Sequence, residues 1–229
     1  TVYCVRSWKL KKSPLTDTKA AYRQKGIAQS CGTRLFFLRF EQEVFLMAKA
    51  VVFFAEGTEE CEALLVVDLL RRAKVEVLVA SASGSREILS SHKVHITADA
   101  LAEEVDYSDV DLVVLPGGIP GTPNLAANKT VTDTCVAFAK AGKKVAAICA
   151  APSVLAALGL LEGKNATAHA AFQDKLAGAH VLDTEVVVDG NITTSYGLGG
   201  AIPFALELVR QLAGEAEADR IRSAIAYRH

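Results

Sequence analysis

The most informative part of the 229-residue chain is Lys144-Val145-Ala146-Ala147-Ile148-Cys149-Ala150-Ala151-Pro152-Ser153. Its first five residues are typical of a buried strand, and the proline shortly after them is typical of the first turn of a helix. A cysteine at such a strand-to-helix turn holds its sulfur beside the free N–H groups of the helix. These groups and the helix dipole favour thiolate over thiol. The sequence therefore predicts a reactive Cys149.

Strand and helix patterns alternate outward from this turn. The patterns predict strands at 51–55, 75–80, 111–115 and 144–148, with shorter ones at 166–169, 185–188 and 191–194. Helices are predicted at 59–73, 130–141, 201–213 and 215–226, and a hairpin at 87–97. This alternation is typical of right-handed βαβ units around a mainly parallel sheet, in which sites form at the carboxyl ends of the strands.

Composition and charge narrow the class of protein. The chain is 51% hydrophobic and 22% charged, as expected for a globular protein. Residues 47–229 carry 16 basic and 23 acidic side chains, which argues against a nucleic-acid partner. Apolar runs are too short for a membrane span, and the widely spaced Cys61, Cys135 and Cys149 fit neither a disulfide framework nor a zinc site. We therefore expect a cytoplasmic protein with reduced thiols and no membrane partner.

Residues 1–46 differ from the rest of the chain. They carry nine basic and three acidic residues, and the only methionine, Met47, directly precedes the first predicted strand. Three interpretations stay open: a translated leader, a disordered N-terminal extension, or an organelle-targeting peptide. In each case the predicted domain comprises residues 47–229.

Candidate partners for Cys149 follow other strand ends. Glu62 lies one turn into the helix after the first strand, where it is either a proton partner of the sulfur or merely an acid favourable in a first helical turn. Gly117 and Gly118 follow the strand at 111–115 and allow close backbone approach. The N–H groups of Gly118 and Ala150 are candidate oxyanion donors.

Histidines are weaker candidates. His169 ends a short predicted strand and is either a proton carrier at the site or a packed or surface residue. Asp68 is either an acid that orients His169 or an acid of the helix surface. His92 and His95 share one face of a strand, and without a third ligand nearby we expect a solvated hairpin and no metal site.

Glycine-rich stretches give no sign of a nucleotide. Gly197-Leu198-Gly199-Gly200 is a candidate anion cradle at the start of a helix. Neither a GxGxxG after the first strand nor a GxxxxGK[ST] occurs in the chain, so we expect no nucleotide cofactor.

Four motifs in this order resemble those of the ThiJ/PfpI superfamily. They are Ala55-Glu56-Gly57-Thr58-Glu59-Glu60-Cys61-Glu62, Val113-Val114-Leu115-Pro116-Gly117-Gly118, Ala146-Ala147-Ile148-Cys149-Ala150-Ala151-Pro152 and Thr193-Thr194-Ser195-Tyr196-Gly197-Leu198-Gly199. The chain most resembles the Parkinson disease protein seven ("DJ") branch and its bacterial relatives. The resemblance covers 47–229 and none of 1–46.

The resemblance implies an α/β fold, a flavodoxin-like three-layer sandwich of the class I glutamine amidotransferase type, and a homodimer. It implies that Cys149 is the nucleophile and redox-sensitive thiol, Glu62 its protonated partner and Gly118 a backbone donor. His169 falls where relatives carry a site histidine, and Asp68 where they carry an acid beside it. No cofactor or metal is implied.

The function implied is cofactor-independent chemistry on reactive 2-oxoaldehydes. This is a glutathione-independent glyoxalase reaction, methylglyoxal to lactate, with a deglycase activity on glycated groups as a related role in stress defence. The alternatives are a redox-sensing stress protein or chaperone with an oxidisable Cys149 and little turnover, and a cysteine peptidase. Tyr196 stands where many relatives have arginine, and Cys61 where methionine or threonine is common.

Overall fold

The computed structural model describes residues 47–228. The three interpretations of residues 1–46 concern residues outside this range. No helix within 47–228 is both long and apolar enough to cross a bilayer.

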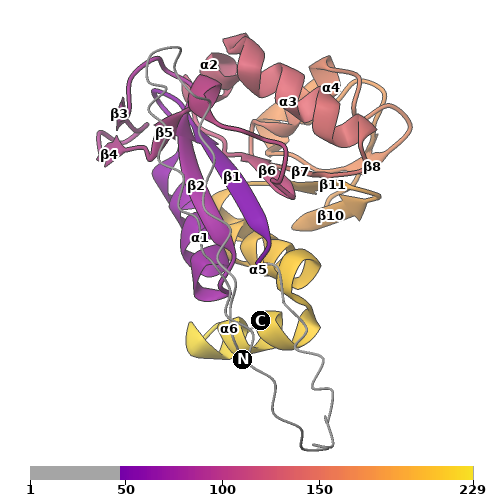
Figure 1. The fold of residues 1–229 in the computed structure, drawn as a ribbon. Coiled ribbons are helices and arrows are strands. Elements are labelled where there is room, and N and C mark those ends of the chain that lie inside the picture. The colour runs from indigo at the N-terminus through magenta and orange to yellow at the C-terminus, as the bar shows by residue number, and fades with distance from the viewer. Residues whose placement is uncertain (1–46, 229) are drawn as a thin grey trace, which may run out of the picture.

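A seven-stranded sheet forms the centre of the molecule (Figure 1), with strands in the order β10-β11-β7-β6-β1-β2-β5. All neighbouring pairs are parallel except β10 with β11. The strands are β1 (Lys49–Phe54), β2 (Glu76–Ser81), β5 (Ala100–Leu101), β6 (Leu112–Leu115), β7 (Lys144–Ile148), β10 (Val186–Asp189) and β11 (Ile192–Ser195). The predicted mainly parallel sheet is confirmed.

Helices cover both faces of this sheet (Figure 1). One face carries α1 (Glu60–Arg72), α5 (Ala201–Ala213) and α6 (Glu215–Ala224), and the other carries α2 (Gly121–Ala127), α3 (Lys129–Lys140) and α4 (Pro152–Ala157). Along β1, Val52 and Phe54 pack in the first layer, whereas Val51 and Phe53 pack in the second. Successive strand residues point to opposite faces, so β1 is buried on both sides. The predicted three-layer sandwich is confirmed.

Smaller elements surround the main sheet. The predicted hairpin is present as β3 (Glu87–Leu89) and β4 (His95–Thr97), which pair antiparallel, and β8 (Asn165–Ala166) pairs with β9 (His180–Val181). Three short 3-10 helices are η1 (Ala102–Glu104), η2 (Ala170–Lys175) and η3 (Leu198–Gly200).

The predicted strand at 166–169 is wrong beyond Ala166. His169 instead begins η2, where its ring accepts a hydrogen bond from the Ala171 N–H. A side chain that caps a helical turn competes with strand pairing, and apolar periodicity alone does not reveal it.

The strands β1, β6, β7 and β11 are adjacent, and their carboxyl ends lie at one edge of the sheet. The segments that leave these ends carry Glu62, Gly117, Cys149 and Gly197. The topology thus brings the four sequence motifs together.

Candidate active site

Cys149 directly follows β7 and has a left-handed backbone conformation, with φ of 66°. This conformation is costly for a residue with a Cβ, by about 1–3 kcal/mol, and persists only where the surroundings impose it. Here the Cys149 N–H donates to the Ser195 carbonyl, and the Cys149 carbonyl accepts from the His169 N–H, both at 2.9 Å. The strained turn is therefore fixed by β11 on one side and by the start of η2 on the other.

The Glu62 side chain lies beside the Cys149 sulfur. Glu62 is only 1% exposed, and its carboxyl forms a hydrogen bond with the Cys149 thiol. The Gly117 N–H donates to Glu62 Oε2 at 3.1 Å, and the Leu198 N–H also donates to this carboxyl. The carboxyl therefore faces the sulfur and does not merely complement the helix dipole in solvent.

Gly117 leaves no room for a side chain between these two groups. A Cβ at this position would lie 2.6 Å from Glu62 Oε2 and 3.1 Å from Cys149 Sγ. Side chains do not tolerate contacts this short, so the close approach of acid and thiol depends on glycine here.

Two backbone N–H groups point at the sulfur. They belong to Gly118, after β6, and to Ala150, the residue after Cys149. Gly118 has a positive φ of 97°, which glycine adopts without strain. The two predicted candidate donors are thus placed where they can stabilise negative charge on the sulfur or on an oxygen bound next to it.

Acid and thiol share one proton over a wide pH range. Burial raises the pKa of Glu62 to about 7. Burial also raises the pKa of Cys149 to about 12, and the Glu62 carboxylate adds to this rise, whereas the Gly118 and Ala150 N–H groups lower it. Between these values the pair carries one negative charge and titrates as a unit.

The predicted preference for thiolate is therefore corrected. The N–H groups at the turn act in the expected direction, but desolvation and the charge of Glu62 outweigh them. In the monoanionic pair, the thiol keeps its proton until Glu62 accepts it.

His169 borders the sulfur from the other side. A Cβ on Gly197 would lie 3.6 Å from His169 Cδ2 and 3.8 Å from Cys149 Sγ, so both flank Gly197. The ring Nδ1 accepts from the Ala171 N–H at 3.2 Å, which assigns the proton of the neutral ring to Nε2. Nε2 neighbours Cδ2 in the ring, so the protonated nitrogen lies on the edge that flanks Gly197.

Asp68 has a different partner. Its Oδ2 accepts from Arg72 Nε at 2.8 Å on the exposed face of α1, one turn further along the same helix. The interpretation of Asp68 as an acid of the helix surface fits this contact. Within the described chain, the partner of its carboxylate is Arg72 and not His169.

Two contributors to the site were not predicted in these roles. The Leu198 N–H, within the stretch considered as an anion cradle, binds the Glu62 carboxyl. Glu59 caps α1, with its Oε2 accepting from the Glu62 N–H at 2.6 Å. The spacing of three residues between Glu59 and Glu62 is the spacing of an N-cap residue and the N–H that it accepts from, so the sequence held a signal for this role. Glutamate is not among the preferred N-cap residues, which is why the role was missed.

His92 is 70% exposed, as expected for a solvated hairpin, but it lies in the turn between β3 and β4 and not on the face of a strand. Its Nδ1 lies 3.0 Å from Glu60 Oε1 and 3.9 Å from Glu59 Oε1. In residues 47–228, these three side chains form the one group with ligand atoms close enough to hold a metal ion. A hydrogen bond between the His92 ring and the Glu60 carboxylate accounts for the arrangement.

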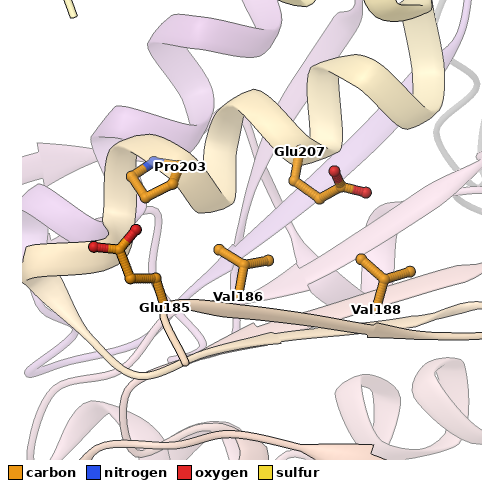
Figure 2. Close-up of a pocket in the computed structure, with 5 residues that line it drawn as sticks. All are labelled: Glu185, Val186, Val188, Pro203 and Glu207. Carbon is orange, nitrogen blue, oxygen red and sulfur yellow. The ribbon is translucent and has the colours of Figure 1, made fainter. Parts of the chain in front are cut away.

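A separate groove lies between β10 and α5 (Figure 2). It has a volume of about 400 Å³ and is lined by Glu185, Val186, Val188, Pro203 and Glu207. Valine side chains of the strand form one wall, and Pro203 and Glu207 of the helix form the other. None of the groups that contact Cys149 Sγ lines this groove.

Comparison with known proteins agrees with the fold. The sequence profile of the DJ-1/PfpI family matches residues 48–211. The chain is 37% identical to protein dj-1beta of Drosophila melanogaster, over 75% of this chain and 93% of that protein. It is 33% identical to the glutathione-independent glyoxalase DJR-1.2 of Caenorhabditis elegans, over 69% of this chain and 85% of that protein.

Other relatives are longer or have solved structures. Protein DJ-1 homolog B of Arabidopsis thaliana is 40% identical over 161 residues, which are 70% of this chain but only 37% of that protein. The solved structure "Toxoplasma gondii DJ-1, oxidized" matches with a TM-score of 0.77 and 35% identity, over 80% of this chain and all of that one.

Proposed function

Since the chain belongs to the DJ-1/PfpI family, we propose that it is a cysteine enzyme that converts small 2-oxoaldehydes to 2-hydroxy acids without cofactor or glutathione. Methylglyoxal, which yields lactate, is the simplest such substrate. The observation that carries the proposal is the contact between the Cys149 thiol and the buried Glu62 carboxyl, flanked by two N–H donors. A similar protein in Caenorhabditis elegans is named a glutathione-independent glyoxalase.

The first step joins sulfur and aldehyde. Cys149 Sγ attacks the aldehyde carbon while Glu62 takes the thiol proton, so thiolate forms only as the new bond forms. The aldehyde oxygen becomes negative and then accepts this proton from Glu62, which gives a hemithioacetal and returns Glu62 to the carboxylate. The N–H groups of Gly118 and Ala150 stabilise the transient oxyanion, a type of interaction worth about 10²–10³ in rate.

The second step moves a proton between two carbons. Glu62 as carboxylate removes the proton from the former aldehyde carbon, and an enediol forms. Glu62 returns this proton to the neighbouring carbon while the hydroxyl on the sulfur-bound carbon loses its proton, which gives a thioester of the 2-hydroxy acid. Water then cleaves the carbon–sulfur bond, releases the acid and restores the thiol. The net reaction is addition of one water to the 2-oxoaldehyde.

His169 is the second proton carrier in this proposal. Its Cδ2, the ring atom next to Nε2, flanks Gly197 beside Cys149, and the Ala171 N–H holds its Nδ1. A neutral ring in this tautomer donates a proton to the substrate oxygen that becomes the product hydroxyl, and then regains a proton from the hydroxyl on the sulfur-bound carbon as the thioester forms.

The test is lactate formation from methylglyoxal without added glutathione. We expect turnover by the wild type and none by Cys149→Ser beyond the rate of a free thiol at equal concentration. Wild-type protein that does not exceed the thiol control contradicts the proposal.

A redox sensor is the second candidate, favoured by the same N–H donors. The Gly118 and Ala150 N–H groups would bind the oxygens of a Cys149 sulfinate, and protonated Glu62 would donate to it. A similar protein has been solved in oxidized form. Mild peroxide followed by peptide mass spectrometry tests this candidate, and oxidation spread evenly over Cys61 and Cys149 contradicts it.

We also propose a cytoplasmic homodimer. Leu64 on α1 is 41% exposed and Val94 in the hairpin loop is 44% exposed. This loop meets the start of α1 through Ser91, whose hydroxyl donates to Glu60. Contiguous exposed apolar surface is typical of an interface, and the proposal is that these two side chains belong to such a surface. The test is the mass of the purified protein in solution, measured by light scattering. A mass equal to that of one chain would contradict the dimer.

A further inference from the structure

We propose that Glu59 is a positioning residue for the Cys149 reaction, because it holds both the Gly118 donor and the Glu62 acid in place. This inference rests on the proposed function and adds a residue to it. Glu59 does so with two separate groups, its backbone N–H and its carboxylate.

The backbone N–H of Glu59 orients the Gly118 donor. It donates to the Gly117 carbonyl at 3.0 Å. In a planar trans peptide the C=O and N–H point in opposite directions. Because Glu59 holds the carbonyl of the Gly117–Gly118 peptide, the N–H of the same peptide is directed at Cys149 Sγ, where it donates.

The carboxylate of Glu59 orients Glu62. Its Oε2 accepts from the Glu62 N–H at 2.6 Å, the closing contact of the first turn of α1. This bond fixes the backbone from which the Glu62 carboxyl reaches the Gly117 N–H, with 3.1 Å between Oε2 and that nitrogen. The acid and the N–H donor that both contact the sulfur are thus anchored to one residue.

Glu59 also acts through its charge. The charged or titratable groups that face Glu62 are Cys149 across the pocket and Glu59 on its own helix, and the Glu59 charge raises the pKa of Glu62. Beyond Glu59 lie His92, 3.9 Å from its Oε1, and Glu60, which pairs with His92. Loss of the Glu59 charge lowers the pH at which the Glu62–Cys149 pair gives up its first proton.

Three variants separate geometry from charge. Glu59→Ala removes the cap and the charge but keeps the backbone N–H that binds the Gly117 carbonyl, so it tests the contact of the carboxylate with Glu62. Glu59→Gln removes the charge but keeps a side-chain oxygen that can accept from the Glu62 N–H. Glu60→Gln is the matched control, because it neutralises the adjacent carboxylate, which contacts Ser91 and His92.

Two readouts are needed for each variant: kcat and KM with methylglyoxal, and the pH dependence of Cys149 alkylation by iodoacetamide. We expect Glu59→Ala to lower kcat about 10-fold with little change in KM, since misplacement of catalytic groups costs rate rather than binding. Glu59→Gln restores kcat to within about threefold of wild type at its own pH optimum, because it retains the cap. Its alkylation profile moves to lower pH, and the Glu60→Gln profile does not move.

The alkylation arm does not require turnover, so it tests Glu59 even if the proposed function fails. An unshifted profile in Glu59→Gln, or an equal shift in Glu60→Gln, overturns the inference. Unchanged kcat in Glu59→Ala overturns it as well. Circular dichroism and thermal melts of each variant confirm that the comparison is between folded proteins.

Discussion

Cys149 and Cys135 are two thiols of the same domain with the same direction of pKa shift and opposite surroundings. Burial raises the pKa of both to about 12. Cys135 lies within α3, fully buried in the layer that α3 forms on the sheet. Cys149 lies on a strained turn with a carboxyl and two N–H donors around its sulfur. The comparison teaches that a raised thiol pKa does not distinguish an inert cysteine from a candidate nucleophile, whereas a proton acceptor within hydrogen-bond reach does.

The largest expected difference lies in activity. Cys149→Ser should lower lactate formation by at least about 10⁴-fold, as loss of the nucleophile does in a serine protease. Cys135→Ser should retain activity and lose stability, by about 1–3 kcal/mol, because it buries a hydroxyl in an apolar layer. Lactate assays and urea denaturation of both variants check this pair. Equal activity losses would erase the distinction between the two cysteines.

Glu62→Gln removes the carboxyl group that distinguishes the surroundings of Cys149 from those of Cys135. We expect about a 10³-fold loss of kcat, within the range for general acid–base catalysis. Wild-type activity should rise with pH through about 7, as the pair becomes monoanionic and Glu62 gains the ability to accept the thiol proton. The variant should lack this step. Rate measurements from about pH 5 to about pH 9 check it, and a step that persists near pH 7 would assign it to another group.

The same variant should be more stable than wild type at high pH. The pKa of Glu62 is raised from 4.5 to about 7 by folding, so the native state keeps a proton that the unfolded chain has lost. The contribution of Glu62 to the free energy of unfolding is fully present below pH 4.5 and is lost as the pH rises through about 7. The shift corresponds to about 3 kcal/mol at most. Glu62→Gln carries no such cost.

Urea denaturation at two pH values isolates this effect, because other titrating groups cancel between wild type and variant. The stability gain of Glu62→Gln should be large at about pH 8 and near zero at about pH 4. A gain that is equal at both pH values would show that ionisation of Glu62 is not its source.

Much of the fold and of the candidate site could be predicted from the sequence. Strand β7 was predicted with its observed ends, and α1 within one residue of each end, because apolar periodicity and the turn residues around these segments agree. The meeting of Glu62, Gly118 and Cys149 followed from the rule that neighbouring parallel strands end at one edge of the sheet. These are local patterns combined with one topological rule.

The features that the sequence did not predict depend on contacts between segments that lie far apart in the chain or on burial. Helix α2 was not predicted, since its seven residues include Gly121 and Pro123, and its first turn is held by N–H bonds from Gly121 to Gly57 and from Thr122 to Gly118. The balance between thiol and thiolate at Cys149 was misjudged. A sequence indicates where a helix begins and therefore where free N–H groups lie, but it does not indicate how far the sulfur is removed from water. Asp68 was considered both as an acid that orients His169 and as an acid of the helix surface, and its contact with Arg72 agrees with the second interpretation.

The smallest expected effects come from two glycines, one between Glu62 and Cys149 and one on the surface after α3. Gly117→Ala places a Cβ 2.6 Å from both Cys149 Cβ and Glu62 Oε2, so acid and thiol must move apart. Forced packing of this kind costs about 1–3 kcal/mol. Gly142, at the end of α3, has a φ of 72°, and no atom lies within 4 Å of the position that a Cβ would take there. Gly142→Ala therefore bears backbone strain alone, about 1 kcal/mol. Only Gly117→Ala should also slow alkylation of Cys149 by iodoacetamide. Equal alkylation rates in the two variants would mean that the contact between Glu62 and the sulfur does not govern the reactivity of this thiol.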